Sequence, residues 1–139
     1  MIVITFGGNP YAMPWLNKIK GLLHCWYLGS MGGEALAGVL SGKVNPSGKL
    51  PVTFAKKLED YPYYAYGKKA YPGENKQVYY SEGIYIGYRH FDTRKVEPQF
   101  PFGYGLSYTS FKYGKPMLSS PIITNDAPIT VSVPAVSHI

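Results

Sequence analysis

Hydrophobic positions in the first 57 residues fall into short groups that are separated by Gly, Pro and Asn. Residues 2–6 and 22–28 are continuous apolar runs, which are typical of strands buried on both faces of a parallel sheet. Residues 14–20 and 34–40 instead space their apolar positions as helices do. This order predicts a βαβα unit of the α/β class, with a parallel sheet and right-handed crossovers.

A third strand is predicted over residues 49–54, after the turn formed by residues 45–48. Pro51 lacks the backbone N–H that a central strand needs, so an edge position is expected.

The pattern changes after residue 57. Twelve of the 14 Tyr lie between Tyr61 and Tyr113, among Gly and Pro and with little helical period. Residues 58–106 are therefore predicted to be an extended connector with a few short strands. From residue 107 hydrophobic positions alternate with a period of two, which predicts one or two strands of a β-sandwich. A complete sandwich needs about seven strands, so only its beginning is expected here.

Composition narrows the possibilities further. A chain of 139 residues with 45% hydrophobic side chains can bury a core and is not a disordered tail. Cys25 is the single cysteine, which excludes an intramolecular disulfide and a cysteine-based zinc finger. No run approaches the ~20 apolar residues of a membrane span, and no signal peptide is visible, so localisation stays open. Entry into a strand at residue 2 suggests truncation.

The net charge of +6 raises the possibility of a nucleic-acid partner. The basic residues are scattered pairs rather than one stripe, however, so no nucleic-acid partner is expected. Stacking of sugar rings on Tyr or Trp is chemically more natural for a surface rich in phenols.

Few residues carry candidate chemistry. The loop 29–33 precedes a helix and could hold an anion, but glycines that serve a tight strand-to-helix turn explain it better. His24 is expected to be a hydrogen-bonded core histidine and Cys25 a buried apolar filler. No metal site and no cofactor are expected.

Glu82 is the one carboxylate surrounded by aromatic residues. Desolvation there could prepare it for general-acid duty, while an ion pair with Arg89 is an equally good account. We therefore regard Tyr80 and Glu82 as candidate substrate-binding residues and assign no catalytic residue.

Several segments together resemble the C-terminal region of glycoside hydrolase family 3, in the style of β-glucosidases of Bacteroidetes. These segments are residues 8–10 (GNP), 13–15 (MPW), 26–29 (WYLG), 32–33 (GG), 44–54 (VNPSGKLPVTF), 71–74 (YPGE), 78–89 (VYYSEGIYIGYR) and 100–109 (FPFGYGLSYT). The resemblance covers residues 1 to about 134.

The resemblance implies a long parent enzyme with a (β/α)8-type barrel, an α/β-sandwich domain and a fibronectin type III-like β-sandwich. Residues 1–57 would be the last part of the α/β domain, 58–106 the Tyr-rich connector and 107–139 the start of the fibronectin-like domain. The family hydrolyses β-glycosides with retention, through a nucleophilic Asp and an acid/base Glu. Both would lie upstream, and neither Glu82 nor Asp92 falls on these positions. The chain alone is thus expected to be inactive, although its parent would act on β-linked oligosaccharides or glycosides.

The last residues depart from the family pattern. Residues 129–134 fit the valine-rich strand of the family, but 135–139 do not, and an interrupted reading frame would explain the difference. Open strand edges also predict marginal stability and self-association of such a fragment. The alternative function is a noncatalytic carbohydrate-binding or scaffold module that uses the Tyr-rich segment.

Overall fold

The computed structural model describes residues 1–122 and 128–138. Two residues of the sequence analysis lie outside the described residues. They are the carboxylate Asp126 and Ile139, the last residue of the tail.

The first two apolar runs form a parallel pair of strands, as predicted. Strand β1 (Ile2–Thr5) pairs with β2 (Gly21–His24) in a register that places Thr5 opposite His24. Strand β2 is shorter than the predicted 22–28, and just beyond it Trp26 adopts a positive φ of 48° that is incompatible with extended backbone.

The connection between these strands contains only the 3-10 turn η1 (Leu16–Lys18) in place of the helix predicted over 14–20. The segment between Pro14 and Gly21 is short and has no side-chain N-cap, which leaves the first turn without stabilisation. Helix α1 (Gly32–Leu40) begins two residues before its predicted start and is otherwise as expected.

The predicted third strand is wrong. Residues 49–54 make only one isolated bridge, between Phe54 and Phe100, and lie antiparallel to residues 99–104 rather than at the edge of the parallel sheet. The Leu50 N–H donates to Tyr104 O (2.8 Å) and the Phe54 N–H to Phe100 O (2.9 Å). Pro51 contributes no donor between them, so the pairing stays confined to the two ends of the segment.

The Tyr-rich connector is more helical than predicted. It contains short helical elements and isolated bridges in place of the few short strands expected. The elements are η2 (Leu58–Asp60), α2 (Pro62–Tyr66), η3 (Gly67–Lys69) and α3 (Tyr88–Arg94). Pro62 suits the first turn of α2, and the His90 imidazole contacts Asp60 O (3.1 Å), which ties α3 to η2.

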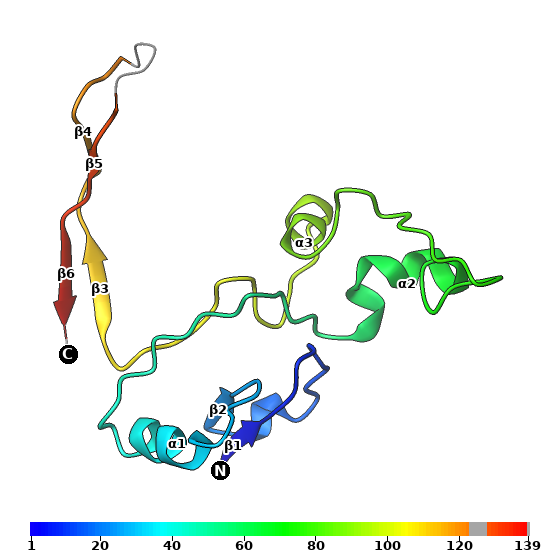
Figure 1. Ribbon diagram of the computed structural model, residues 1–139, viewed down its shortest axis with the longest axis horizontal. Coiled ribbons are helices and arrows are strands. Elements are labelled where there is room, and N and C mark those ends of the chain that lie inside the picture. The colour runs from blue at the N-terminus through cyan, green and yellow to red at the C-terminus, as the bar shows by residue number, and fades with distance from the viewer. Residues whose placement is uncertain (123–127, 139) are drawn as a thin grey trace.

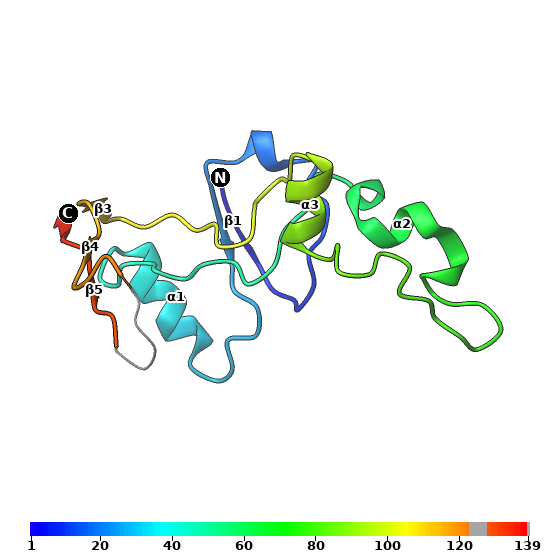
Figure 2. The same ribbon diagram turned by 90° about the horizontal axis from the view of Figure 1, so that it is seen from above.

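The C-terminal part forms strands, as its period-two pattern predicted, but the described residues contain four short antiparallel strands rather than one or two. Strand β3 (Ser110–Tyr113) pairs with β6 (Ala135–His138), and β4 (Met117–Leu118) pairs with β5 (Val131–Ser132). These strands stand apart from the rest at one end of the molecule, whereas α2 lies toward the other end (Figures 1 and 2). Residues 135–138, which depart from the family pattern, therefore form a paired strand.

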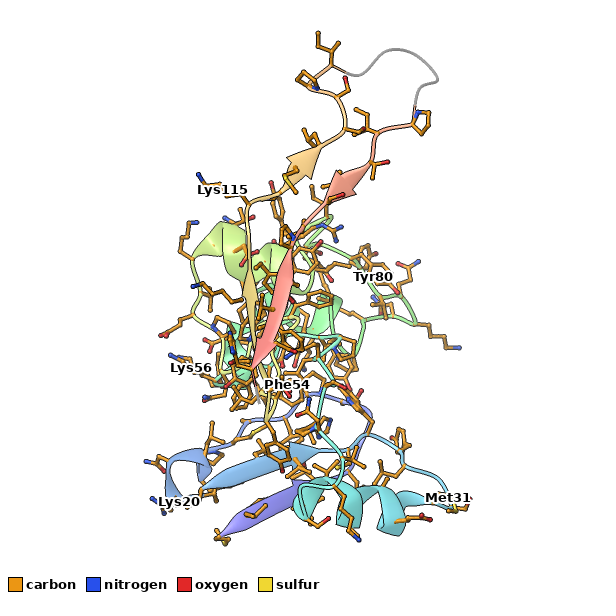
Figure 3. All side chains as sticks on the ribbon, turned by 90° about the vertical axis from the view of Figure 1, so that its left-hand side faces the viewer. Lys20, Met31, Phe54, Lys56, Tyr80 and Lys115 are labelled. Carbon is orange, nitrogen blue, oxygen red and sulfur yellow. The ribbon has the colours of Figure 1, made fainter. Side chains whose placement is uncertain are left out.

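The core is small and lies where segments distant in sequence meet. Its buried hydrophobic residues are Met13, Phe54, Ala55, Ala70 and Phe91. Phe54 is 1% exposed and lies in the middle of the molecule (Figure 3). None of the helices in the described part of the chain has the length and apolar character that a membrane crossing requires.

Candidate functional site

The carboxyl ends of β1 and β2 open onto an apolar groove of about 400 Å³. Ligands of α/β sheets commonly bind at this edge of parallel strands. The groove is lined by Phe6, Trp26, Tyr27, Leu28, Gly29, Gly32, Gly33 and Leu36. Tyr27 is 81% exposed and Phe6 59% exposed, so the groove has aromatic walls that face solvent.

The glycines of this loop allow the close approach of helix α1 to the loop that precedes it. A methyl group on Gly32 would lie 2.8 Å from Leu28 Cβ, closer than packed atoms tolerate, and Gly29 has a positive φ of 67°. Glu34 occupies the first turn of α1, where its charge complements the helix dipole. The tight turn expected from the sequence is thus what the glycines provide.

His24 lies behind this edge in an aromatic cluster. Its ring centroid is 5.7 Å from that of Tyr11, 4.4 Å from Trp26 and 5.4 Å from Phe54, and its Nδ1 is 3.0 Å from Thr5 Oγ1. The Tyr11 hydroxyl donates to the same Thr5 oxygen. Burial lowers the pKa of the His24 imidazole, so the neutral ring is favoured. The expected hydrogen bond of His24 is found, but the residue is half-buried rather than part of the core, and its Nε2 has no partner within the described residues.

Cys25 is half-buried rather than fully buried. Burial raises the pKa of its thiol, which keeps the sulfur protonated and unreactive.

The two candidate substrate-binding residues have opposite environments. Tyr80 is 82% exposed and projects from the Tyr-rich segment into solvent (Figure 3). Glu82 is half-buried, and its Oε2 is buried without a hydrogen-bond partner in the described part of the chain. A turn joins them, in which the Gly83 N–H donates to Tyr80 O (3.2 Å).

The ion pair between Glu82 and Arg89 does not form. Among residues 1–122 and 128–138 the one ion pair joins Lys56 to Glu97. The Arg89 guanidinium instead lies 5.1 Å from the centre of the Tyr88 ring, which satisfies it as a cation–π pair. The hydrogen bond from Lys56 Nζ, followed by its charge, lowers the pKa of the exposed Glu97 carboxyl.

A second groove, of about 500 Å³, was not predicted. It is lined by Leu58, Tyr63, Tyr64, Gly67, Lys68 and Tyr71 around helix α2. The sequence signal available for this groove was Pro62 followed by closely spaced Tyr residues. Helix α2 has only five residues, however, which is too short for a helical period of hydrophobic positions to be recognised. Within the described residues no three His, Cys, Asp or Glu side chains come together as a metal site would need.

Comparison of this chain with known proteins shows which family it belongs to. Residues 1–88 match the glycosyl hydrolase family 3 C-terminal domain. The chain belongs to glycoside hydrolase family 3. The family resemblance carried by the sequence motifs is therefore correct.

Relatives of family 3 match the chain over nearly its whole length. It is 50% identical over 133 residues to the β-glucosidase BoGH3A of Bacteroides ovatus, which covers 96% of this chain and 18% of the relative. It is 44% identical to the thermostable β-glucosidase B of Acetivibrio thermocellus, covering 96% of this chain and 17% of the relative. The chain thus spans less than a fifth of the length of these family 3 proteins.

Solved structures of family 3 share the fold. The β-glucosidase DesR of Streptomyces venezuelae, solved in complex with D-glucose, gives a TM-score of 0.84 at 41% identity, over 96% of this chain and 17% of that one. A family 3 β-glucosidase of Bifidobacterium adolescentis gives 0.84 at 36% identity, over 98% of this chain and 19% of that one. The elongated shape of the chain is therefore shared with a portion of much larger molecules.

Proposed function

We propose that this chain is the C-terminal part of a retaining β-glucosidase, which hydrolyses terminal β-glycosidic bonds in oligosaccharides or glycosides. The observation that carries the proposal is the 50% identity, over 96% of the chain, to a protein named as a β-glucosidase. On this proposal the 139 residues are inactive alone and contribute structure to the enzyme.

The expected inactivity follows from the chemistry of retention. A glycosyl-enzyme intermediate requires two carboxyl groups about 5–5.5 Å apart, one nucleophile and one acid/base. The family resemblance assigns both to positions upstream of this chain. Glu97 is paired with Lys56, and Glu82 has a buried oxygen beside an exposed turn; neither is proposed as catalytic.

We further propose the domain layout that the resemblance implies: 1–57 as the end of an α/β-sandwich domain, 58–106 as a connector and 107–139 as the start of a fibronectin type III-like sandwich. The parallel pair β1–β2 supports the first assignment, and the antiparallel pairs β3–β6 and β4–β5 support the last.

Assay of the purified chain on an aryl β-glucoside tests the inactivity. No turnover above background is expected, because the two carboxyl groups are lacking. Turnover that persists through purification would contradict the proposal, and its loss in Glu82→Gln but not in Glu59→Gln would assign the chemistry to Glu82.

A noncatalytic carbohydrate-binding module is the second candidate, favoured by the exposure of Tyr80. Its ring is 82% exposed and free to stack on a sugar, with Glu82 two residues away as a possible acceptor for sugar hydroxyls. Calorimetric titration with cello-oligosaccharides tests it. Binding should disappear in Tyr80→Ala and persist in Tyr113→Ala, whose side chain is 68% exposed on β3; absence of binding to the unmodified chain would dismiss this candidate.

A further inference from the structure

The groove around helix α2 has aromatic walls that contact one another. It lies toward the end of the molecule opposite the strands β3–β6 (Figure 1). Three of its lining residues are tyrosines, namely Tyr63, Tyr64 and Tyr71. The ring centroids of Tyr63 and Tyr71 are 5.6 Å apart, and the ring planes are inclined by 59°. Tyr71 is 69% exposed and Tyr64 is 52% exposed, so a ligand can reach both rings from solvent.

The Tyr63 wall is held in place by the interior of the chain. The Tyr61 ring stacks on the Tyr63 ring, with 6.0 Å between centroids and 14° between planes. On the Tyr61 ring the buried Phe91 packs edge to face, at 6.0 Å and 90°. The Tyr61 hydroxyl oxygen also accepts a hydrogen bond from the Ala55 N–H (3.2 Å). Tyr63 is therefore ordered before a ligand arrives, which lowers the entropic cost of binding.

The groove also offers hydrogen-bonding groups that the fold leaves unused. Within the described part of the chain, the tyrosine hydroxyls that form hydrogen bonds belong to Tyr11, Tyr61, Tyr79 and Tyr108. The hydroxyls of the three groove tyrosines are thus open to a ligand. Lys68 lines the same groove and is exposed, and the one ion pair among the described residues lies elsewhere.

These groups match the chemistry of a sugar. A pyranose ring has an apolar C–H face that stacks on an aromatic ring, and a rim of hydroxyl groups that bonds polar groups. The lining formed by the described residues contains no carboxylate, which a divalent cation would need. Its single cation is too few for a nucleic-acid backbone, and its one aliphatic side chain, Leu58, is too few for the apolar face of a helix. The volume of about 500 Å³ is within the range of small-molecule sites.

We propose that the groove around helix α2 binds one sugar unit of a β-linked oligosaccharide. The sugar ring stacks on Tyr71, the most exposed of the three tyrosines. The hydroxyls of Tyr63 and Tyr64 and the Lys68 ammonium group bond the sugar hydroxyls. The β-linkage rests on the proposed origin of the chain in a β-glucosidase, whereas the site itself does not rest on catalysis. It is separate from Tyr80, which does not line the groove.

Calorimetric titration of the full 139-residue chain with cellotetraose tests the site. Saturable binding is expected. Tyr71→Ala removes the ring on which the sugar stacks and should weaken binding about tenfold. Tyr66→Ala is the matched control and should bind as the unmodified chain does, because Tyr66 lies on the same helix, is 41% exposed and does not line the groove.

Two further variants separate loss of contact from loss of folding. Tyr71→Phe keeps the ring and should bind nearly as tightly as the unmodified chain. Lys68→Met removes a donor at an exposed position and should weaken binding about two- to thirteen-fold. Circular dichroism of each variant verifies that the fold is unchanged.

The outcomes distinguish this groove from other sites and ligands. Weaker binding by Tyr71→Ala and Lys68→Met, with Tyr66→Ala unchanged, would support the groove. No saturable binding at millimolar cellotetraose, or equal losses in Tyr71→Ala and Tyr66→Ala, would overturn it. Binding that is lost in Tyr80→Ala but kept in Tyr71→Ala would overturn it in favour of the Tyr80 surface.

Two alternative ligands complete the test. Affinity for p-nitrophenol equal to that for cellotetraose would overturn the sugar assignment, because an aromatic compound would then be the occupant. Equal affinity for maltotetraose, the α-linked isomer, would support a sugar site but contradict the β-linkage that comes from the proposed function.

Discussion

Phe54 is the residue on which the small core depends most. It is 1% exposed, and its ring meets those of Tyr11, His24 and Phe100 at centroid distances of 5.8, 5.4 and 6.4 Å. Through these contacts Phe54 joins its own segment to the parallel strands, by way of His24, and to the segment around residue 100, by way of Phe100. The fold therefore depends on one aromatic side chain to hold together parts that are far apart in sequence.

Replacing Phe54 with Ala should lower the free energy of unfolding by about 3–5 kcal/mol, the range measured for buried aromatic truncations. Phe111→Ala is the matched control, because Phe111 is 56% exposed on β3 and should cost less than about 0.5 kcal/mol. Urea titrations of both variants measure the difference. Equal losses would show that the core does not depend on Phe54.

His24 should make stability depend on pH. Burial lowers its pKa in the folded state, so above about pH 6.5 both folded and unfolded states hold it neutral and its contribution is complete. As pH falls below that value the unfolded chain binds the proton first, and unfolding becomes easier until the folded pKa is reached. Each pH unit in that window costs at most about 1.4 kcal/mol.

Unfolding midpoints at pH 7.5 and 5.5 test this expectation. The unmodified chain should be less stable at the lower pH, and His24→Gln should lose most of that dependence while His90 and His138 remain. A variant that keeps the full dependence would assign it to another group.

At the scale of elements, hydrogen bonds of Asn45 and Tyr108 tie the segment before the C-terminal strands to the α/β part. Asn45 Oδ1 accepts hydrogen bonds from Ser107 Oγ (2.9 Å) and from the Tyr108 N–H (2.8 Å). The Tyr108 hydroxyl donates to Val39 O (2.9 Å) at the end of α1. These contacts fix the chain immediately before β3.

Asn45→Ala should release this attachment. Loss of a hydrogen bond with a net value of about 0.5–1.5 kcal/mol corresponds to exchange of the Tyr108 amide that is about two- to thirteen-fold faster. Asn45→Asp keeps an acceptor oxygen and should leave the exchange rate close to that of the unmodified chain. Amide hydrogen exchange at Tyr108, with the β1–β2 amides as internal reference, measures the effect; identical rates in both variants would contradict it.

The elements that could be predicted from sequence are those with local signals. The apolar run of β1 and the helical spacing of α1 are clear patterns, and both elements are found. Residues 49–54 have strand-like composition, but Pro51 interrupts their pairing, and the partner lies about 50 residues away. In α3 the spacing of Tyr88 and Phe91 suits a helix, but abundant Tyr around it hides the signal.

Some features of the candidate site can likewise be predicted from neighbouring residues, and others depend on the folded chain. The half-buried position of Glu82 agrees with its apolar and aromatic neighbours in sequence, whereas the absence of its ion pair depends on how Arg89 packs against Tyr88. The groove beside β1 and β2 combines Phe6 with Leu36, which only the folded chain brings together.

At the scale of the whole molecule, the chain buries less surface on folding than a compact domain of equal length. An unfolded chain of 15.4 kDa exposes about 22,000 Å², so reaching 10878 Å² buries about half of it, where a compact domain would bury about two-thirds. The heat-capacity change of unfolding scales with the buried apolar area, and much of the area left exposed here is apolar.

The heat-capacity change should therefore be about 1.3–1.6 kcal/mol/K, compared with about 1.7–2.1 kcal/mol/K for a compact domain of 139 residues. Differential scanning calorimetry on dilute samples measures it, and the slope of unfolding free energy against urea should be reduced by the same factor of about three-quarters. A heat-capacity change at the compact value for the isolated monomer would contradict this expectation, because it would mean that the apolar surface left exposed in the fold is buried in solution.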